Sequence, residues 1–525
     1  MLTFNSPVPM DRLDTLCRSL FPADAPGAAI GVLTGDGMRY AKGFGLANLA
    51  TKTPFTPQTP FRACSISKQF VCLLIRQLEH EGKIELDAHP SRYLPELATF
   101  PPRLSVRHLC QNRSGLRDYW CAAMLMGARA ESRFTLDDGA ALIRSLAEPM
   151  FAPGSQYSYS NGNWRILEWI IEAVTGRLLP ELLAERIFTR LGMHATGWGC
   201  DTGIALAGNI KGYRQTGAGW EEEVTRLCWS GDAALVTTLD DYLAWEAVLL
   251  KPDLAVLPCA DTLAEALPHP NGEPGCYAFG INAWQQGART MHWHGGALRG
   301  WRMVQMRFPQ EQTSIVVMLN RTENPSPFAM KIAECIDIKT TWDDVEESPR
   351  PSRHGIAGAY FSADLGLLAE IRDKDDQLLL DLGGEAAPLL WTGERTLANA
   401  SGFFRLEWRE PKVNIRARHF GWQASFLRLA FRDDHALLAG RTFRSDLLKS
   451  AITFSDAGTA LSIQGPCGQS DHYPVRALAE GFVAFDCDRA LDELPPGRFT
   501  IQISQDCRRI EVSCFLARGF LFTSR

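Results

Sequence analysis

The sequence lacks several features that would assign it to a function class at once. Its 525 residues contain no block of lysines and arginines, and the net charge of -6 gives a nucleic-acid partner no electrostatic support. No apolar run approaches the length of a membrane span. The first eleven residues contain no basic stretch followed by an apolar one, so we expect no export signal. These absences exclude nucleic acid and membrane as expected partners.

Paired cysteines of the form Cys-x-x-Cys are also missing, although the chain has 14 cysteines. Several lie within apolar runs, such as Cys72, Cys228 and Cys514. Unpaired cysteines without an export signal are typical of free thiols in a reducing cytoplasm. We therefore expect a cytoplasmic protein that has no structural metal site.

The order of helical and strand patterns divides the chain into domains. In residues 1–335, strand patterns at both ends enclose helical patterns, which predicts one α+β domain whose terminal strands share an antiparallel sheet. Residues 336–353 are charged and contain prolines, which indicates a linker. Beyond them, short alternating strands and turns continue to the end, which is typical of small β-barrels or sandwiches. The late strands of the first domain are expected at 278–284, 290–294, 302–307 and 314–319.

The second half contains an internal repeat at a constant offset of 82 residues. The matching residues are Gly358, Phe361, Asp364, Leu365, Ala369, Leu379 and Gly383, which recur as Gly440, Phe443, Asp446, Leu447, Ala451, Leu461 and Gly465. The repeat predicts two copies of one β-domain, at about 354–436 and 437–525. The copies diverge after Phe403 and Phe485, where only the second carries a polar, strand-breaking insertion. Such an insertion suggests a loop with a role of its own.

The motif Ser65-x-x-Lys68 begins an apolar-periodic run that predicts a buried helix ending near Gly82. Residues three apart lie on one helical face, so Ser65 Oγ and Lys68 Nζ can meet. A serine hydroxyl needs a nearby base to become a good nucleophile. A lysine held in an apolar pocket beside another cation can lose its proton and help supply that base. Alone, the motif is more typical of a helix N-cap serine and a solvated lysine than of a catalytic pair.

A second motif, Tyr159-x-Asn161, follows a turn at 151–154. A tyrosine flanked by cations can ionise below its free pKa of about 10. Its phenolate could take the proton of Ser65 and pass it to a leaving amine. In isolation, the same residues would be read as an aromatic plug in a turn.

The third motif is His294-Gly295-Gly296-Ala297, at the end of a predicted strand. Its glycines allow the backbone to approach a ligand closely. The N–H of Ala297, together with that of Ser65, could bind a developing oxyanion. His294 would supply a polar or cationic group beside the substrate; the alternative is a surface histidine in a hairpin.

Together and in this order, the three motifs resemble the Ser-x-x-Lys, Tyr/Ser-x-Asn and Lys-Thr-Gly set of penicillin-recognising enzymes. The chain is thus similar, over about residues 15–335, to the superfamily of class C β-lactamases, D-alanyl-D-alanine carboxypeptidases and serine esterases. Supporting stretches include residues 81–87, 108–116 and 231–240. The resemblance implies an antiparallel sheet flanked by helices and a serine nucleophile. His294 replaces the lysine that helps hold a substrate carboxylate, which argues against substrates anchored by a carboxylate.

That histidine and the two appended β-domains narrow the resemblance to the D-stereospecific aminopeptidases. The resemblance implies removal of N-terminal D-residues, preferably D-alanine, from small peptides, amides and esters, without a cofactor, by a homodimer. It also implies a loop of the last β-domain in the catalytic cleft, here at about 482–492. An aminopeptidase must bind a free α-ammonium, and a desolvated carboxylate discriminates well against blocked termini. Asp486 is the first candidate for this carboxylate and Asp488 the second.

Two other functions stay open at the level of sequence. An esterase, β-lactamase or carboxypeptidase would use Ser65, Lys68, Tyr159, Asn161 and His294 with different pocket walls. An acylatable sensor would trap a β-lactam or peptidoglycan fragment and signal through the β-domains. The complete acid–base set, with no membrane segment or output module, favours an enzyme.

Overall fold

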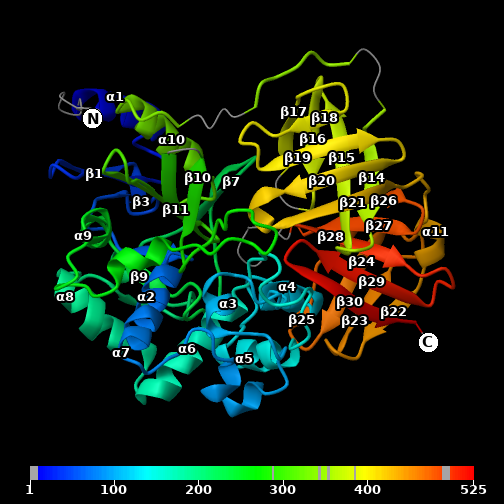
Figure 1. Ribbon diagram of the computed structural model, residues 1–525, viewed down its shortest axis with the longest axis horizontal. Coiled ribbons are helices and arrows are strands. Elements are labelled where there is room, and N and C mark those ends of the chain that lie inside the picture. The colour runs from blue at the N-terminus through cyan, green and yellow to red at the C-terminus, as the bar shows by residue number, and fades with distance from the viewer. Residues whose placement is uncertain are drawn as a thin grey trace.

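The computed structural model describes residues 10–286, 289–340, 345–351, 355–383, 386–487 and 497–524. Three bodies are visible in Figure 1: an α+β domain made by the first two thirds of the chain and two β-barrels made by the rest. The fold class predicted from the sequence is confirmed. The boundaries placed at 335, 354 and 437 stay predictions.

The first domain is built on a six-stranded antiparallel sheet. In sheet order its strands are β10 (Asn282–Gln286), β11 (Arg289–Leu298), β12 (Trp301–Phe308), β13 (Thr313–Leu319), β1 (Ala28–Thr34) and β2 (Arg39–Phe44). Strand β1 pairs with β13 along its full length, so the two ends of the domain close one sheet. Every residue of β12 and β13 is buried, because helices cover both faces.

One expected strand is partly wrong. Residues 278–284 were predicted as a strand, but β10 begins only at Asn282. Before it, Ala278 N–H donates to Ile281 O in a tight turn, with Gly280 at a φ of 72°. A Cβ on Gly280 would lie 2.5 Å from Lys68 O, so the apolar run 278–281 bends to pack on a helix instead of extending the sheet.

Helices cover the two faces of the sheet as separate layers (Figure 1). One face packs against α1 (Met10–Leu20) and α10 (Ser326–Cys335). The other packs against α2 (Ser67–His80) and α9 (Leu239–Leu250), where a Cβ on Gly31 of β1 would collide with Leu239 and Leu243. The remaining helices stack behind α2: α3 (Val106–Cys110), α4 (Tyr119–Leu125), α5 (Leu136–Ser145), α6 (Gly162–Thr175), α7 (Leu179–Leu183) and α8 (Thr189–Leu191).

The first barrel is closed, since its last described strand pairs with its first. Its strands are β14 (Gly358–Ser362), β15 (Leu367–Lys374), β16 (Gln377–Asp381), β17 (Ala387–Trp391), β18 (Thr396–Ala398), β19 (Phe404–Arg409), β20 (Lys412–Ala417) and β21 (Trp422–Arg428). Burial alternates along β21, where Trp422, Ala424 and Phe426 point inward. This two-residue period is what fills a small barrel with side chains.

The second barrel closes through pairing of β23 with β24. Its strands are β22 (Thr442–Ser445), β23 (Ser450–Phe454), β24 (Ala460–Gly465), β26 (Tyr473–Ala479), β27 (Phe482–Asp486), β28 (Arg498–Ile503), β29 (Arg509–Cys514) and β30 (Ala517–Thr523), with β25 (Gly468–Gln469) as a short extension. The repeated residues Leu379 and Leu461 both lie in the third strand of their barrels. The repeat read from the sequence thus corresponds to two similar barrels.

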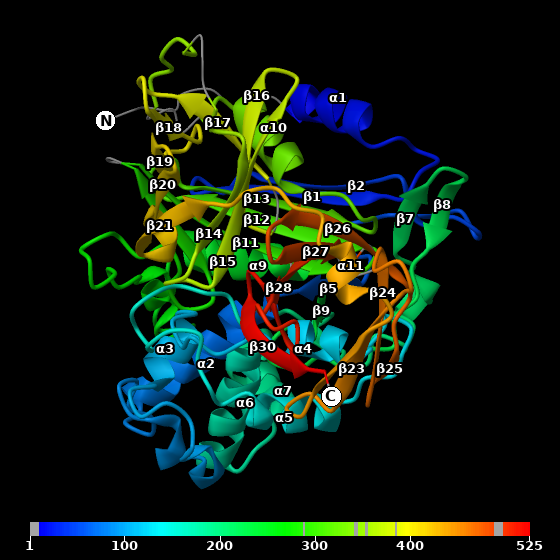
Figure 2. The ribbon, with the colours of Figure 1, turned by 90° about the vertical axis from the view of Figure 1, so that its right-hand side faces the viewer.

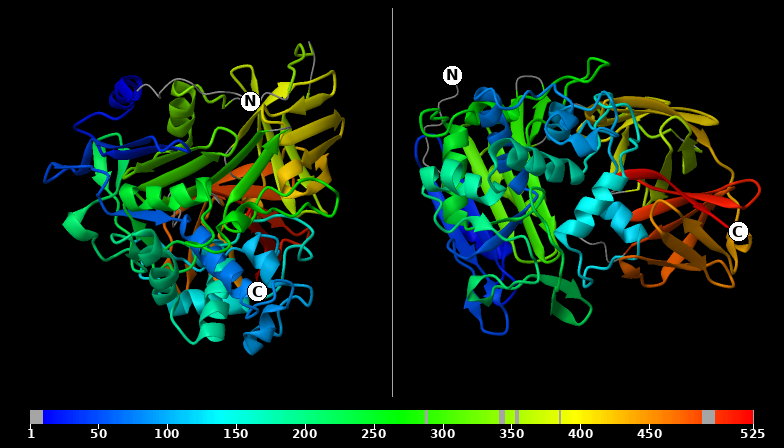
Figure 3. Two further views of the ribbon diagram at one scale, coloured as in Figure 1. Left: turned by 60° about the vertical axis from the view of Figure 1, so that its left-hand side comes forward. Right: turned by 90° about the horizontal axis from the view of Figure 1, so that it is seen from below.

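Both barrels pack against the first domain (Figure 2, Figure 3). From the first barrel, Phe420 O accepts a hydrogen bond from Tyr157 N–H at 3.0 Å. From the second, Cys467 N–H donates to Met126 O at the end of α4. Within the described ranges, no helix has both the length and the apolarity needed to cross a bilayer.

The contact with the first barrel contains two neutral histidines, His269, which is buried, and His419, which is half-buried. His269 Nε2–H donates to His419 O at 3.1 Å. Burial lowers the pKa of both to about 4, helped by Arg113 for His269 and by Arg418 for His419. Because an unfolded histidine titrates near 6.5, the unfolded chain takes up protons first as the pH falls.

We therefore expect the free energy of unfolding to fall between pH 6.5 and pH 4 and to be unaffected by these two groups above pH 7. Each histidine lowers the free energy of unfolding by up to about 3 kcal/mol as the pH falls through that window. Urea denaturation at several pH values measures how steeply the free energy of unfolding changes with pH, which reports the number of protons taken up on unfolding. His269→Gln should lower that number by nearly one. The matched control is His472→Gln, which alters an exposed histidine and should leave the slope unchanged. An equal slope in all three proteins would contradict the prediction.

Candidate active site

Ser65 lies between strand β5 (Phe61–Cys64) and helix α2. Lys68 N–H donates to Ser65 O at 3.2 Å, so the first helical turn brings the two side chains to one face. Lys68 Nζ donates to Ser65 Oγ at 3.1 Å and to Asp232 O at 2.5 Å. Lys68 is fully buried, and Ser65 keeps 8% of its surface exposed. The structure therefore brings the predicted nucleophile and its lysine into direct contact.

Tyr159 lies over the same lysine. Lys68 Nζ is 5.1 Å from the centre of the Tyr159 ring and 5.2 Å from that of Trp164 in α6. A cation at this distance from an aromatic face is attracted to it, and it also favours the ionised form of a phenol. Two further tyrosines lie nearby, Tyr277 fully buried and Tyr157 partly buried, and desolvation raises the pKa of each well above its usual value. Of the three phenols, Tyr159 is the one that faces the lysine.

His294 occupies the middle of β11, not the end of a strand as expected. Burial and the Lys68 charge lower its pKa to about 3, so the ring is neutral at pH 7. Its Nδ1–H donates to Gly295 O at 2.6 Å, and its Nε2 accepts from the Tyr277 hydroxyl at 2.9 Å. Of the two roles considered for His294, this environment favours the polar one over the cationic one.

Gly296 lets β11 pack closely against β5, the strand that precedes Ser65. A Cβ on Gly296 would lie 2.3 Å from Ala63 O in β5, so no larger residue fits without displacing that strand. The close approach in the structure is between the backbones of β11 and β5. It places Ala297, which is 5% exposed, on the strand segment beside the residues that precede Ser65.

Asn161 is held by a buried carboxylate that sequence reasoning missed. Both its N–H and its Nδ2 donate to Asp118 Oδ2, at 2.7 and 3.0 Å. Burial raises the pKa of Asp118, although these hydrogen bonds oppose the shift. Asp232, also missed, supplies the carbonyl to Lys68, while its own carboxylate accepts from Tyr119 Oη at 2.7 Å. Asp232 lies in a stretch that supported the resemblance, but no spacing rule assigned either residue a partner.

The predicted ammonium ligands lie on the second barrel. Asp486 ends β27, and its side chain is 60% exposed. Its Oδ1 lies 3.6 Å from Nε of Arg498, the residue paired with it across the hairpin. Both residues of this ion pair belong to the second barrel. Asp488 lies outside the described residues.

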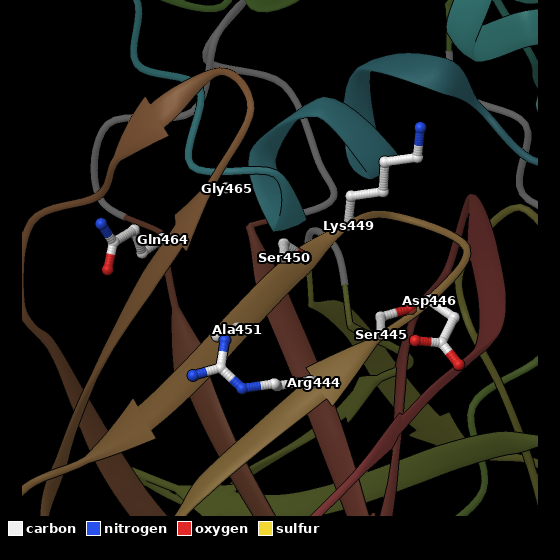
Figure 4. Close-up of a pocket in the computed structure, with 8 residues that line it drawn as sticks. All are labelled: Arg444, Ser445, Asp446, Lys449, Ser450, Ala451, Gln464 and Gly465. Atoms are coloured by element: carbon white, nitrogen blue, oxygen red, sulfur yellow. The ribbon is translucent and has the colours of Figure 1, made fainter.

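A separate cavity of about 520 Å³ opens on the second barrel (Figure 4). Its lining residues are Arg444, Ser445, Asp446, Lys449, Ser450, Ala451, Gln464 and Gly465. None of the predicted site residues lines it, and Figure 4 shows Arg444 and Lys449 pointing to different sides. The cavity is therefore separate from the candidate active site at Ser65.

Comparison with known proteins agrees with the class defined by this fold and site. Residues 19–334 match the Beta-lactamase family, and residues 350–523 match "D-aminopeptidase, domain B". Among solved structures, an octameric penicillin-binding protein homologue from Pyrococcus abyssi superposes with a TM-score of 0.55 at 18% identity, over 79% of this chain and 99% of that one. A D-stereospecific amidohydrolase from Streptomyces superposes with a TM-score of 0.51 at 20% identity, over 62% and 98%. At these identities the likeness shows the fold alone, and the chain is a serine hydrolase of the β-lactamase type.

Full-length relatives give the particular family. A D-aminopeptidase of Brucella ovis is 31% identical over 511 residues, covering 94% of this chain and 95% of that protein. A D-aminopeptidase of Gluconobacter oxydans is 29% identical, covering 97% and 98%. The chain belongs to the D-aminopeptidase family.

Proposed function

We propose that this protein hydrolyses N-terminal D-amino acids, preferably D-alanine, from small peptides, amides and esters through an acyl-enzyme on Ser65. The observation that carries the proposal is the contact of Lys68 Nζ with Ser65 Oγ at 3.1 Å, with Tyr159 over the same ammonium. Family membership supports D-aminopeptidase activity in general. The preference for D-alanine and the covalent intermediate are the proposal's own.

In the proposed reaction, Ser65 Oγ attacks the carbonyl carbon of the N-terminal residue. Tyr159, whose proton affinity is lowered by Lys68, accepts the serine proton and returns it to the leaving amine. The N–H groups of Ser65 and Ala297 bind the oxyanion as it forms. Asn161 orients Lys68 and the substrate backbone. Water then cleaves the ester of Ser65, taking the same proton route in reverse.

The neutral state of His294 supports substrates that are not anchored by a carboxylate. A cation at this position would attract a C-terminal carboxylate, as in carboxypeptidases. With its pKa near 3 and its Nε2 bound to Tyr277, His294 supplies no positive charge at pH 7. The proposal therefore places recognition at the amino end of the substrate.

Recognition of that end is proposed to come from the segment joining β27 to β28, with Asp486 or Asp488 as the partner of the substrate ammonium. A buried carboxylate is costly to leave without its ammonium partner, so such a site rejects substrates whose N-terminus is blocked. Arg498, the partner of Asp486, also contacts Glu370 and Asp381. Glu370 and Asp381 also pair with Arg476 and Arg372, so Asp486 is the third carboxylate in a cluster of three guanidinium groups. A substrate ammonium would therefore compete with Arg498 for Asp486.

The proposal also includes a homodimer in the cytoplasm. The dimer follows from the resemblance to D-stereospecific aminopeptidases. The compartment follows from scattered cysteines that form no Cys-x-x-Cys pair in the sequence. Light scattering of the purified protein tests the dimer directly.

The function is tested with four substrates in one assay: D-Ala-p-nitroanilide, its L-isomer, its N-acetylated form and a penicillin. We expect the D-isomer to be cleaved at least about 100-fold faster than the L-isomer in kcat/KM. The N-acetyl form should lose about 10³-fold or more, since the carboxylate would be left unpaired. Preferential turnover of the penicillin or of the N-acetyl form would overturn the proposal.

Asparagine variants of the two carboxylates serve as matched controls in the same assay. One of Asp486→Asn and Asp488→Asn should remove the partner of the substrate ammonium. That variant should raise KM for D-Ala-p-nitroanilide and reduce the difference in kcat/KM between this substrate and its N-acetylated form. The other should stay within about two-fold of the parent enzyme. If neither variant narrows the gap, the segment is not the recognition element.

A further inference from the structure

The segment Tyr157–Asn161 carries two candidate catalytic groups, yet it has no regular secondary structure. Four of its backbone N–H groups donate to partners outside the segment. Tyr157 donates to Phe420 O (3.0 Å), Ser158 to Asn112 O (2.9 Å), Ser160 to Asn112 Oδ1 (3.1 Å) and Asn161 to Asp118 Oδ2 (2.7 Å). Its conformation is therefore set by its neighbours and not by a local helix or ladder.

One of these neighbours belongs to the first barrel. Phe420 ends a short turn between β20 and β21, and its ring packs on Tyr157 at 5.6 Å between centroids. Tyr157 in turn packs on Tyr277 at 5.7 Å, which binds His294. A chain of aromatic contacts thus runs from the first barrel to the rings that surround Tyr159.

The turn that carries Phe420 is itself fixed to the first domain. His419 O accepts from His269 Nε2–H and from Cys276 Sγ–H, both at 3.1 Å, and Gly421 O accepts from Asn271 Nδ2 at 3.2 Å. With Phe420 O, three consecutive carbonyls of the barrel accept hydrogen bonds from the first domain. Gly421 has a φ of 70°, and a Cβ there would lie 2.3 Å from His269 Nδ1. The turn has little freedom to move.

The second barrel reaches the same segment through Asp118, the residue that holds Asn161. Leu516 O accepts from Asp118 N–H at 3.2 Å, and Arg518 O accepts from Arg117 Nε–H at 2.6 Å. The guanidinium of Arg117 also lies 5.5 Å from the centre of the Phe520 ring. The position of Asp118 therefore depends on the turn between β29 and β30.

The two barrel turns also contact each other. The rings of Phe420 and Phe515 meet edge to face with centroids 5.1 Å apart. We infer that the two barrels together fix the Tyr157–Asn161 segment, with Phe420 as a positioning residue for Tyr159. The barrels then contribute to the chemical step itself, in addition to any role in choosing substrates.

The proposal is tested with Phe420→Ala in the full-length chain. A displacement of about 1 Å at a catalytic group costs on the order of 100-fold in rate. We expect kcat to fall about 10- to 100-fold with KM within about three-fold, and the pH dependence of kcat to shift, since Tyr159 would sit differently against Lys68. Phe420→Tyr should restore both the rate and the pH profile. A rise in KM alone, or an unchanged kcat and pH profile, would overturn the proposal.

The matched control is Phe431→Ala, which removes a phenylalanine that is 76% exposed and should leave kcat unchanged. Reaction of Ser65 with a fluorophosphonate reports on the nucleophile without a peptide substrate, so it separates failure of this inference from a wrong substrate assignment. It should slow in Phe420→Ala by the same factor as kcat.

A second variant keeps the test decisive if Phe420→Ala does not fold. Phe515→Ala removes the ring of the other barrel that contacts Phe420. We expect it to slow fluorophosphonate labelling about three- to ten-fold while leaving the protein folded by circular dichroism. A folded Phe515→Ala protein that labels at the parent rate would contradict coupling between the barrels and the segment.

Discussion

Ser65→Ala is expected to lower kcat by about 10⁴- to 10⁶-fold while leaving substrate binding in place. The expected loss is large because Ser65 Oγ is the atom that Lys68 Nζ contacts at 3.1 Å and that must form the acyl bond. Alanine keeps the backbone N–H of residue 65, so the proposed oxyanion donors stay. Steady-state kinetics on D-Ala-p-nitroanilide measures kcat, and isothermal titration with the substrate measures the retained affinity.

The matched control for this variant is Ser450→Ala. Ser450 is 4% exposed, close to the 8% of Ser65, but it lies in the second barrel. Its hydroxyl has no hydrogen-bond partner in the part of the chain that the structure describes, so alanine should change neither the rate nor the stability by much. Near-normal turnover by Ser65→Ala, with the Ser450→Ala protein as reference, would disprove the role of Ser65.

The contact between Ser65 and Lys68 could be predicted from the sequence because its geometry is local. Ser65 and Lys68 are three residues apart at the start of a helix, and helical geometry alone brings their side chains together. The same holds for the barrels, where a two-residue period and a repeat report on strand structure directly. Such features depend on near neighbours in the chain and not on how domains pack.

The supports of the site could not be predicted in the same way. Asp118, Asp232 and Tyr277 act on Asn161, Lys68 and His294 through tertiary contacts that no spacing rule encodes. Phe420 comes from another domain altogether. These contacts depend on how the first domain and the barrels are packed.

The third motif shows a different limit. The histidine and the two glycines that follow it were expected at the end of a strand, where the glycines would let the backbone approach a ligand closely. In the structure His294 lies in the middle of β11, and Gly296 serves the contact with Ala63. A glycine required by close packing and a glycine required by a ligand have the same sequence signature.

Lys68→Met is expected to lower kcat by about 10³- to 10⁴-fold without a matching loss of stability. Methionine keeps most of the apolar stem but removes the ammonium that contacts Ser65 Oγ and lies 5.1 Å from the Tyr159 ring. Without that charge the phenol is a poorer proton acceptor at neutral pH, because no cation favours its ionised form. Fluorophosphonate labelling of Ser65 and kcat should fall together.

Stability separates this role from a structural one. Lys68 is fully buried, and a buried charge is costly to desolvate. Replacing it with a residue of similar shape removes that desolvation cost and so stabilises the fold. The same replacement leaves the Asp232 carbonyl without its hydrogen-bond donor, which destabilises the fold. We expect the free energy of unfolding in urea to change by less than about 2 kcal/mol in Lys68→Met, because these two effects oppose each other. The control Lys83→Met, at an exposed lysine paired with Glu81, should change neither kcat nor the free energy of unfolding by much. Full activity of Lys68→Met would contradict a role of Lys68 in the reaction. So would a loss of activity that only matches the fraction of unfolded protein. In either case the proposed proton transfer through Tyr159 would lack the cation that it requires.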